Sequence, residues 1–300
     1  MNDIFYKIFH GTVQLLSRLP FRVLYFLSDV AFIVVYHIAR YRRKIVRKNL
    51  RNSFPEKSLF DILLIERRFY RFFCDYIVET LKLLTISPAQ MRRHMTMSGI
   101  DALEKSLEHH TLCVIYLGHY CNWEYVATLP LWVPDGVHCA QIYSPLRDRF
   151  SDRLFYEIRT RFGGENIAKK DTFRRLVTLQ QEQKKTIVGF ISDQAPRRIN
   201  IHDWVDFLSQ DTPVFTGAER LSKKLDAAVF YCDMQRIKRG YYHCTFRLMT
   251  ENPKEHPNYE LTDTYMKMLQ DTIRKNPPYW LWSHNRWKRK RLPEDQKREE

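Results

Sequence analysis

The sequence lacks the cysteine patterns, internal repeats and low-complexity segments that mark several specialised classes of protein. The six cysteines include no C-x-x-C pair, which excludes a zinc ribbon, and they form no pattern typical of a disulfide framework. Several of them stand in apolar runs, where a free thiol packs as a small hydrophobic group, and this favours a reducing, cytoplasmic compartment. There is no internal repeat and no low-complexity segment, and hydrophobic residues make up 44% of the chain. An intrinsically disordered chain is therefore excluded, and a sizeable core is available.

Acidic residues are absent between Arg40 and Arg51, a stretch that holds seven basic residues. The formal net charge of the whole chain is +15, which requires an anionic partner or surface, such as nucleic acid, anionic lipid or an acidic carrier protein. A second basic cluster, Arg286 to Arg291, is equally well interpreted as a solvated surface. The first cluster directly follows an apolar segment instead of forming an aromatic-lined groove. We therefore expect anionic membrane lipids rather than nucleic acid as its partner.

That apolar segment, residues 21–39, has about the length of a membrane span, roughly 20 residues. Arg22, Asp29 and His37 interrupt it, so it is expected either to span marginally or to lie at the membrane interface. A buried helix of a soluble core is the alternative. No small-residue cleavage site follows, which argues against a signal peptide. Residues 1–45 are accordingly predicted to be a helical membrane anchor, with the rest of the chain on the cytoplasmic face of the membrane.

Beyond the anchor, short apolar runs alternate with helical patterns. A long helix is expected over residues 56–85. Strands are predicted at 111–117, 137–143, 186–192, 228–234 and 241–249, and helices at 149–163, 171–184, 213–225 (with Pro213 near its start) and 260–275. This alternation predicts an α/β domain over residues 46–290, with a mixed, largely parallel sheet flanked by helices. Residues 291–300 are expected to be a charged tail.

The first of these strands ends in a motif that carries chemistry, Gly118–Glu124. His119 and Glu124 are five residues apart, a spacing that would separate them by about 140° on one helix. They can meet only if His119 sits in the turn before the helix and Glu124 in its first turns, and Gly118 eases such a turn. Glu124 would then bond one imidazole nitrogen and leave the other free to act as a general base. A surface turn without function and a metal site of His119, Cys121 and Glu124 are the alternatives, although no second ligand cluster supports the metal.

The motif does not stand alone. Gly118–Glu124 resembles the H-x4-D/E box of glycerolipid-type acyltransferases, and its aromatic form resembles that of the bacterial lipid A biosynthesis acyltransferases, the lauroyl and myristoyl transferases. Further segments follow in that family's order: Val46–Leu50 with Phe54-Pro55-Glu56, Tyr143-Ser144-Pro145, Asp152 with Arg159–Gly164, Asp193-Gln194, Thr212–Leu225 and Trp280–Lys288. The resemblance covers roughly residues 20–290, and its first and last boxes are the specific ones.

This resemblance implies an acyltransferase of the inner membrane that needs neither a metal nor an organic cofactor. The donor would be acyl carrier protein and the acceptor a hydroxyl of a membrane glycolipid, a lipid A precursor, with His119 as base assisted by Glu124. Binding of the oxyanion or of an acceptor phosphate is expected from the polar residues of the later boxes: Arg159, Asp193, Gln194 and Arg286. The Trp-rich last box is expected to pack in the core, with Arg286 and Lys288 facing lipid headgroups.

Three departures from the family pattern concern specificity rather than chemistry. Ser144 stands where the family often has Arg, Asn285 replaces the first Arg of the last box, and residues 195–211 are rearranged. They leave open the acyl chain length and the acceptor. The same fold acylating a phospholipid, aminolipid or another glycolipid is one alternative, and a non-catalytic basic protein that binds membranes or nucleic acid is another.

Overall fold

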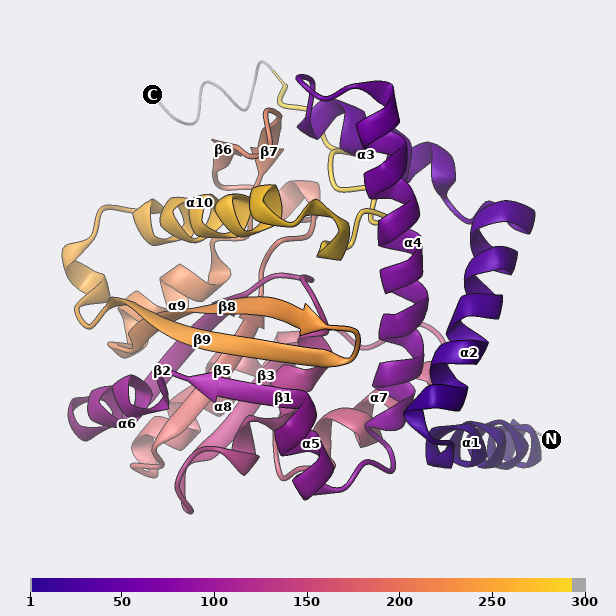
Figure 1. Ribbon diagram of the computed structural model, residues 1–300. Coiled ribbons are helices and arrows are strands. Elements are labelled where there is room, and N and C mark those ends of the chain that lie inside the picture. Colours follow the sequence, from indigo (N-terminus) through magenta and orange to yellow (C-terminus); the bar gives the residue numbers. More distant parts are fainter. Residues whose placement is uncertain (1, 293–300) are drawn as a thin grey trace.

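A computed structural model describes residues 2–292 of the chain (Figure 1). Its centre is a seven-stranded sheet of order β1-β9-β8-β2-β5-β3-β4, beside a two-stranded β6-β7 ribbon. The strands are β1 (Met95–Ser98), β2 (Leu112–Leu117), β3 (His138–Tyr143), β4 (Glu165–Ala168), β5 (Thr186–Ile191), β6 (Trp204–Asp206), β7 (Asp211–Pro213), β8 (Ala228–Lys238) and β9 (Tyr241–Thr250). Within the seven-stranded sheet only the β8–β9 pair is antiparallel. The predicted mixed, largely parallel sheet is confirmed.

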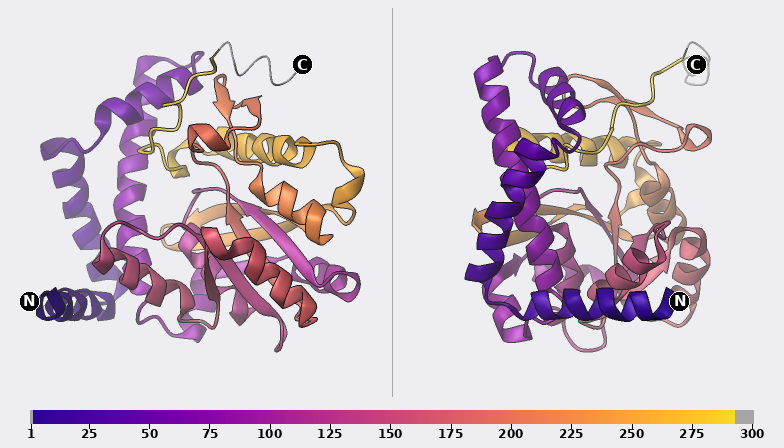
Figure 2. Two further views of the ribbon diagram at one scale, coloured as in Figure 1. Left: turned by 180° about the vertical axis from the view of Figure 1, so that it is seen from behind. Right: turned by 90° about the vertical axis from the view of Figure 1, so that its right-hand side faces the viewer.

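Helices surround this sheet, as Figure 2 shows from two further sides. They are α1 (Asn2–Arg18), α2 (Phe21–Phe32), α3 (Arg43–Ser53), α4 (Leu59–Lys82), α5 (Pro88–His94), α6 (Ile100–His109), α7 (Arg149–Thr160), α8 (Thr172–Gln181), α9 (Gly217–Leu225) and α10 (Glu260–Lys275). All six residues of β2 are buried, and since side chains of a strand alternate between faces, both faces of the sheet are covered there. β2 is thus the apolar centre from which the Gly118–Glu124 motif emerges.

The predicted helices are present, with one notable change of boundary. The helix expected over residues 213–225 begins only at Gly217, because Pro213 pairs with Trp204 in the β6–β7 ribbon. Side chains of the C-terminal segment keep this stretch extended: Trp287 Nε1 donates to Thr212 Oγ1 at 2.7 Å, and an Arg286 nitrogen donates to the Pro213 carbonyl at 2.7 Å. Long-range hydrogen bonds therefore override the helix-start signal of the proline.

The apolar N-terminal segment forms α2 and a following π-helical turn, Ile33–Ile38, which lie alongside α4 (Figure 1). In the described part of the chain, Phe21–Ile38 is the one helical stretch long and apolar enough to cross a membrane by length and composition, and only 22% of it is buried. Phe26 and Ile33 are 66% and 53% exposed. A buried helix of a soluble core is therefore not what the structure contains.

Of the three polar residues that interrupt this segment, Asp29 pairs with the rest of the protein, whereas Arg22 and His37 are exposed; the neighbouring Ser28 is buried. Ser28 donates to Asp75 of α4 at 2.7 Å, and Asp29 pairs with Arg239 at 2.8 Å. Apolar side chains occur on both sides of the helix: Leu24 and Phe32 are buried, whereas Phe26 and Ile33 are exposed. Asp29 is thus explained by docking, and α2 is an amphipathic helix packed against α4.

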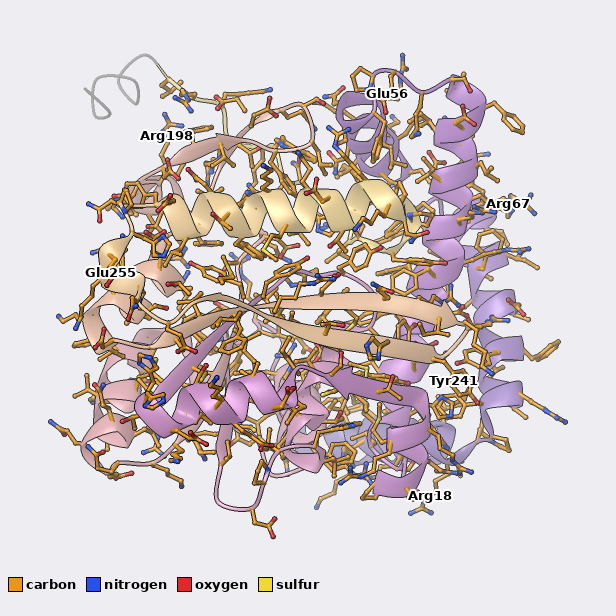
Figure 3. All side chains as sticks on the ribbon, turned by 60° about the vertical axis from the view of Figure 1, so that its left-hand side comes forward. Arg18, Glu56, Arg67, Arg198, Tyr241 and Glu255 are labelled. Atoms are coloured by element: carbon orange, nitrogen blue, oxygen red, sulfur yellow. The ribbon has the colours of Figure 1, made fainter. Side chains whose placement is uncertain are left out.

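Basic side chains line the region beyond the π turn, where residues 43–53 fold into α3. Arg43 and Arg47 pair with the fully buried Glu66 of α4, while Arg67 of α4 projects outward on this side of the molecule (Figure 3). A groove of about 1,330 Å³ follows this run and the start of α4, with Arg40, Lys44, Lys48, Arg51 and Lys57 among its lining residues. Most of the charged tail expected at residues 291–300, that is residues 293–300, lies outside the described part of the chain.

Candidate active site

Two neighbouring strands bring the central residues of the site together. β2 and β5 are parallel, with Leu117 opposite Ile191. His119 follows β2 by two residues, and Asp193 follows β5 by two residues. Because the carboxyl ends of parallel strands lie at one edge of a sheet, this register places the imidazole beside the carboxylate. The two residues are 74 positions apart in the chain.

His119 and Asp193 form a dyad that is held from several sides. Asp193 Oδ1 lies 2.6 Å from His119 Nδ1, and its Oδ2 accepts from the His119 backbone NH at 3.0 Å and from Trp280 Nε1 at 2.7 Å. Burial alone raises the pKa of Asp193, but the charge of His119 and these hydrogen bonds outweigh it and bring the pKa to about 2. The carboxylate is therefore ionised near neutral pH and can only accept, so that Nδ1 of the imidazole carries the proton.

The other imidazole nitrogen is left as an acceptor. Gln194 places its side-chain amide nitrogen 3.1 Å from His119 Nε2. This contact satisfies the lone pair of Nε2 in the tautomer that Asp193 selects. The side chain of His119 is 17% exposed, and the residue lines a cavity beside the sheet. Nε2 is thus the nitrogen able to accept a proton, and its position beside the Gln194 amide is one that a hydroxyl group could take.

Glu124 does not contact the imidazole, and this corrects the hydrogen bond expected from the five-residue spacing. Glu124 instead binds Arg159 through two parallel hydrogen bonds of 2.8 Å and 2.6 Å, and it accepts a third, at 3.1 Å, from Trp123 Nε1. Burial lowers the pKa of Arg159, but the charge of Glu124 and its hydrogen bonds more than compensate and raise it. The orientation of Arg159 toward the site is therefore set by Glu124, while Asp193 orients His119.

The turn after β2 has the arrangement expected from the five-residue spacing of His119 and Glu124. His119 lies in the turn, and Glu124 lies in the first turn of a 3₁₀ helix, Trp123–Leu131. Cys121 carries the positive backbone angle of this turn, with φ of 52°. Gly118 has another role, because a Cβ at this position would lie 2.7 Å from Leu269 of α10. The glycine thus allows α10 to approach the end of β2.

The C-terminal box packs against this turn as expected from its tryptophans. Trp280, Trp282 and Trp287 are all buried, and Trp280 donates a hydrogen bond to Asp193, a long-range contact that no local sequence pattern indicates. Arg286 corrects the expectation of a headgroup contact, because it is fully buried. Burial lowers the pKa of Arg286 to about 10, although the charge of Asp193 raises it. Arg286 therefore supports the core beneath the site rather than the surface.

The cavity next to the dyad has a volume of about 630 Å³. Its lining includes the polar residues His119, Glu124, Arg159 and Gln194. Aliphatic residues of three strands form much of the rest, among them Ile115, Ile142 and Ile187. Ser144 and the segment around His202, where the chain departs from the family pattern, also line it. A cavity that combines a histidine, a carboxylate and an arginine with aliphatic side chains suits an acyl chain with a reactive head.

The metal alternative finds no support in the geometry. Cys121 is fully buried, Glu124 is engaged by Arg159, and residues 2–292 contain no group of three or more His, Cys, Asp or Glu side chains placed to hold a metal ion. All six cysteines are buried free thiols.

Comparison with known proteins agrees with the architecture of the site. No curated protein matches the chain. A family model described as bacterial lipid A biosynthesis acyltransferase matches residues 4–289, which includes the Gly118–Glu124 turn, the strand end at Asp193 and the Trp-rich box. Since this match covers nearly the whole described chain, the protein belongs to the bacterial lipid A biosynthesis acyltransferase family.

Proposed function

We propose that this acyltransferase moves a fatty acyl chain from acyl carrier protein to a hydroxyl, or hydroxyacyl, group of a lipid A precursor, with His119 as the general base. The observation that carries the proposal is the Asp193–His119 pair at 2.6 Å, in which Nε2 contacts the Gln194 amide and the histidine lines a cavity rich in aliphatic side chains. A carboxylate behind an imidazole fixes its tautomer and stabilises the imidazolium that forms during catalysis.

The reaction then proceeds by addition and elimination at the thioester carbonyl. The acceptor hydroxyl replaces the Gln194 amide at Nε2, and Nε2 takes the hydroxyl proton as the oxygen attacks the carbonyl carbon. A new C–O bond forms, and the carbonyl oxygen becomes an oxyanion. When the carbonyl re-forms, the C–S bond breaks, and the leaving thiolate takes the proton back from the imidazolium. Protons and charges balance without a metal or organic cofactor.

Arg159 is proposed to stabilise negative charge in this reaction. Its Nε and one terminal nitrogen are held by Glu124, and the residue lines the same cavity as His119. The remaining nitrogen of the guanidinium is thus available to the oxyanion or to a phosphate of the acceptor. Glu124, in this proposal, assists His119 indirectly by fixing this cation.

The donor assignment can be tested by its dependence on salt. Acyl carrier protein is acidic, and the basic side chains around α3 would attract it over a range set by ionic screening, about 10 Å at 0.1 M salt. We expect the Michaelis constant for acyl carrier protein to rise between low and moderate ionic strength. Kinetics with purified acyl carrier protein and with acyl-coenzyme A would decide. A preference for acyl-coenzyme A without a salt effect would contradict the carrier assignment and favour acylation of another membrane lipid.

We propose further that residues 1–45 bind the protein to the cytoplasmic face of the inner membrane. Crossing the bilayer with α2 would draw its docking partner α4 into the lipid, and α4 carries the exposed Arg67, Arg68 and Arg71. Insertion of so many charges is costly. We therefore favour an interfacial position. It would place the exposed apolar side of α2 in the lipid and the basic run near anionic headgroups, so that both the apolar and the charged side chains have a favourable environment.

If α2 lies at the membrane interface, different changes should abolish membrane binding and folding. Changing both Phe26 and Ile33 to Glu removes apolar groups from the exposed side of α2, so the protein should fold and leave the membrane fraction. Deleting residues 1–39 should instead give a poorly folded domain, since Asp75 loses its Ser28 donor. Fractionation and circular dichroism would measure both results. Phe173→Glu, an exposed position on α8, is the matched control and should stay with the membrane.

Retention of the Phe26→Glu, Ile33→Glu protein on membranes would place the anchor elsewhere on the molecule. A stable, monodisperse protein without residues 1–39 would show that α2 is a separate anchor rather than a docked part of the fold.

A further inference from the structure

A buried hydrogen-bond network lies behind the catalytic turn and is centred on Glu79 of α4. The side chain of Glu79 is fully buried. Its Oε1 accepts from the Tyr25 hydroxyl at 3.1 Å, and its Oε2 accepts from the Tyr242 hydroxyl at 2.7 Å and from Asn122 Nδ2 at 3.0 Å. These donors belong to α2, β9 and the catalytic turn. One carboxylate therefore joins the N-terminal helix, the sheet and the turn that carries His119.

Asn122 connects this network to the reactive residues. It is fully buried within the Gly118–Glu124 motif, between His119 and Glu124. Its Oδ1 has no hydrogen-bond partner within residues 2–292, so the bond to Glu79 is the side-chain interaction that fixes its amide. The residue before it, Cys121, has φ of 52°, a conformation that persists only where surrounding contacts impose it. The turn thus depends on support from outside the motif.

We propose that Glu79 is a positioning residue for the acyl transfer, holding the His119 turn through Asn122 and linking that turn to the docking of α2 through Tyr25. The inference rests on the proposed role of His119 as base. Glu79 itself contacts neither the imidazole nor the cavity wall, so it acts through the turn and takes no part in the chemistry.

The energetics of the site favour this role over simple packing. Burial raises the pKa of Glu79 to about 7, although the hydrogen bonds from Tyr242 and Asn122 lower it; Asp75 of α4 raises it further, and Arg236 of β8 lowers it. Carboxylate burial is costly, and an apolar side chain of similar size would avoid that cost. Three donors from three separate elements compensate for it here, and together they fix orientations that an apolar contact would leave free.

The raised pKa of Glu79 predicts that its contribution to the free energy of unfolding changes with pH. A group whose pKa rises on folding, here from 4.5 to about 7, stabilises the folded state at pH values below 4.5 and loses that contribution as the pH passes about 7. We expect the free energy of unfolding of the wild type, relative to Glu79→Gln, to fall across this window. Denaturant unfolding at several pH values would measure the difference. A difference that does not change with pH would mean that Glu79 does not titrate there.

Activity measurements test the positioning role directly. Folded Glu79→Ala should lose about 10–100-fold in kcat with an unchanged KM for the donor, because a displacement near 1 Å at the reacting groups costs about that much. Glu79→Gln keeps one acceptor oxygen and should recover most of the loss, and Tyr25→Phe should lie between them. Tyr70→Phe is the matched control: it removes a tyrosine hydroxyl of α4 that donates to the Tyr41 carbonyl outside the network, and it should leave kcat unchanged.

A second readout is independent of turnover. In protein labelled with ¹⁵N-histidine, the His119 ring resonances can be assigned by their disappearance in His119→Ala. They should shift in Tyr25→Phe and Glu79→Ala and stay in place in Tyr70→Phe. Wild-type kcat together with unmoved His119 resonances in the Glu79 and Tyr25 variants would overturn the inference. A wild-type protein without acyl transfer would overturn the proposed function instead, and the resonances would still decide the role of Glu79.

Discussion

Replacing His119 by alanine should remove most of the turnover and leave the protein folded. General base catalysis is worth roughly 10²–10⁴-fold, or about 3–5 kcal/mol of barrier, and alanine has no group that can take the hydroxyl proton. His119 sits at the wall of the cavity rather than in the core, so its loss should cost little stability. The measurement is transfer of a labelled acyl chain to purified acceptor lipid, with membrane association and circular dichroism checked for each variant.

Acceptor binding should survive this change, since the lost interaction acts in the transition state and not in the ground state. His138→Ala offers a matched control, because His138 is a partly buried histidine paired with a carboxylate, Glu165, at the opposite end of β3 from the site. That variant should keep wild-type turnover. A folded His119→Ala enzyme with near wild-type turnover would reduce the Gly118–Glu124 motif to a structural turn and remove the proposed mechanism with it.

The second large effect should come from Asp193→Asn, and it should exceed that of Glu124→Gln. An amide at position 193 can donate to Nδ1, which favours the imidazole tautomer whose Nε2 carries a proton and cannot act as a base. The expected loss in kcat is on the order of 10²–10⁴-fold, similar to loss of the base itself. Glu124→Gln weakens the hold on Arg159 but leaves the Asp193–His119 pair intact, so its loss should be smaller.

The relative size of the two losses in kcat tests whether Asp193 or Glu124 orients the His119 imidazole. If Glu124 were the direct partner of the imidazole, Glu124→Gln would be the more damaging of the two changes and would alter the tautomer. Nitrogen chemical shifts of His119 in both variants provide that comparison. An unchanged tautomer in Asp193→Asn, with turnover close to wild type, would contradict the dyad.

Arg159→Lys belongs to the same comparison, because an ammonium group cannot reproduce the two parallel hydrogen bonds to Glu124. Its effect on kcat should resemble that of Glu124→Gln, and the double variant should lose little more than either single one, as expected for two residues that act as a unit.

Much of the fold could be predicted from local patterns. Short apolar runs bounded by turn signals predicted β2, β3, β5, β8 and β9, and 3–4 periodicity predicted α4 and α10. The short elements β1, β4, β6 and β7 were missed, since three or four residues carry too little periodicity to stand out from a loop. The seven-residue helix α5 lies outside the predicted elements, although Ser87 caps its start and Pro88 is its first residue.

The sequence by itself determined that a strand ends in a turn bearing His119, that Glu124 follows in the first turn of a helix, and that the chain belongs with the lipid A acyltransferases. Each of these depends on residues close together in the chain or on the order of motifs. Only the tertiary structure decided which carboxylate orients the imidazole. His119 and Asp193 are 74 residues apart, and Glu124 and Arg159 are 35 apart, so both pairs depend on which strands and helices become neighbours and in what register. The same holds for Tyr25 and Glu79, because a hydrogen bond extends only about 3 Å and requires that the whole fold first bring its two partners together.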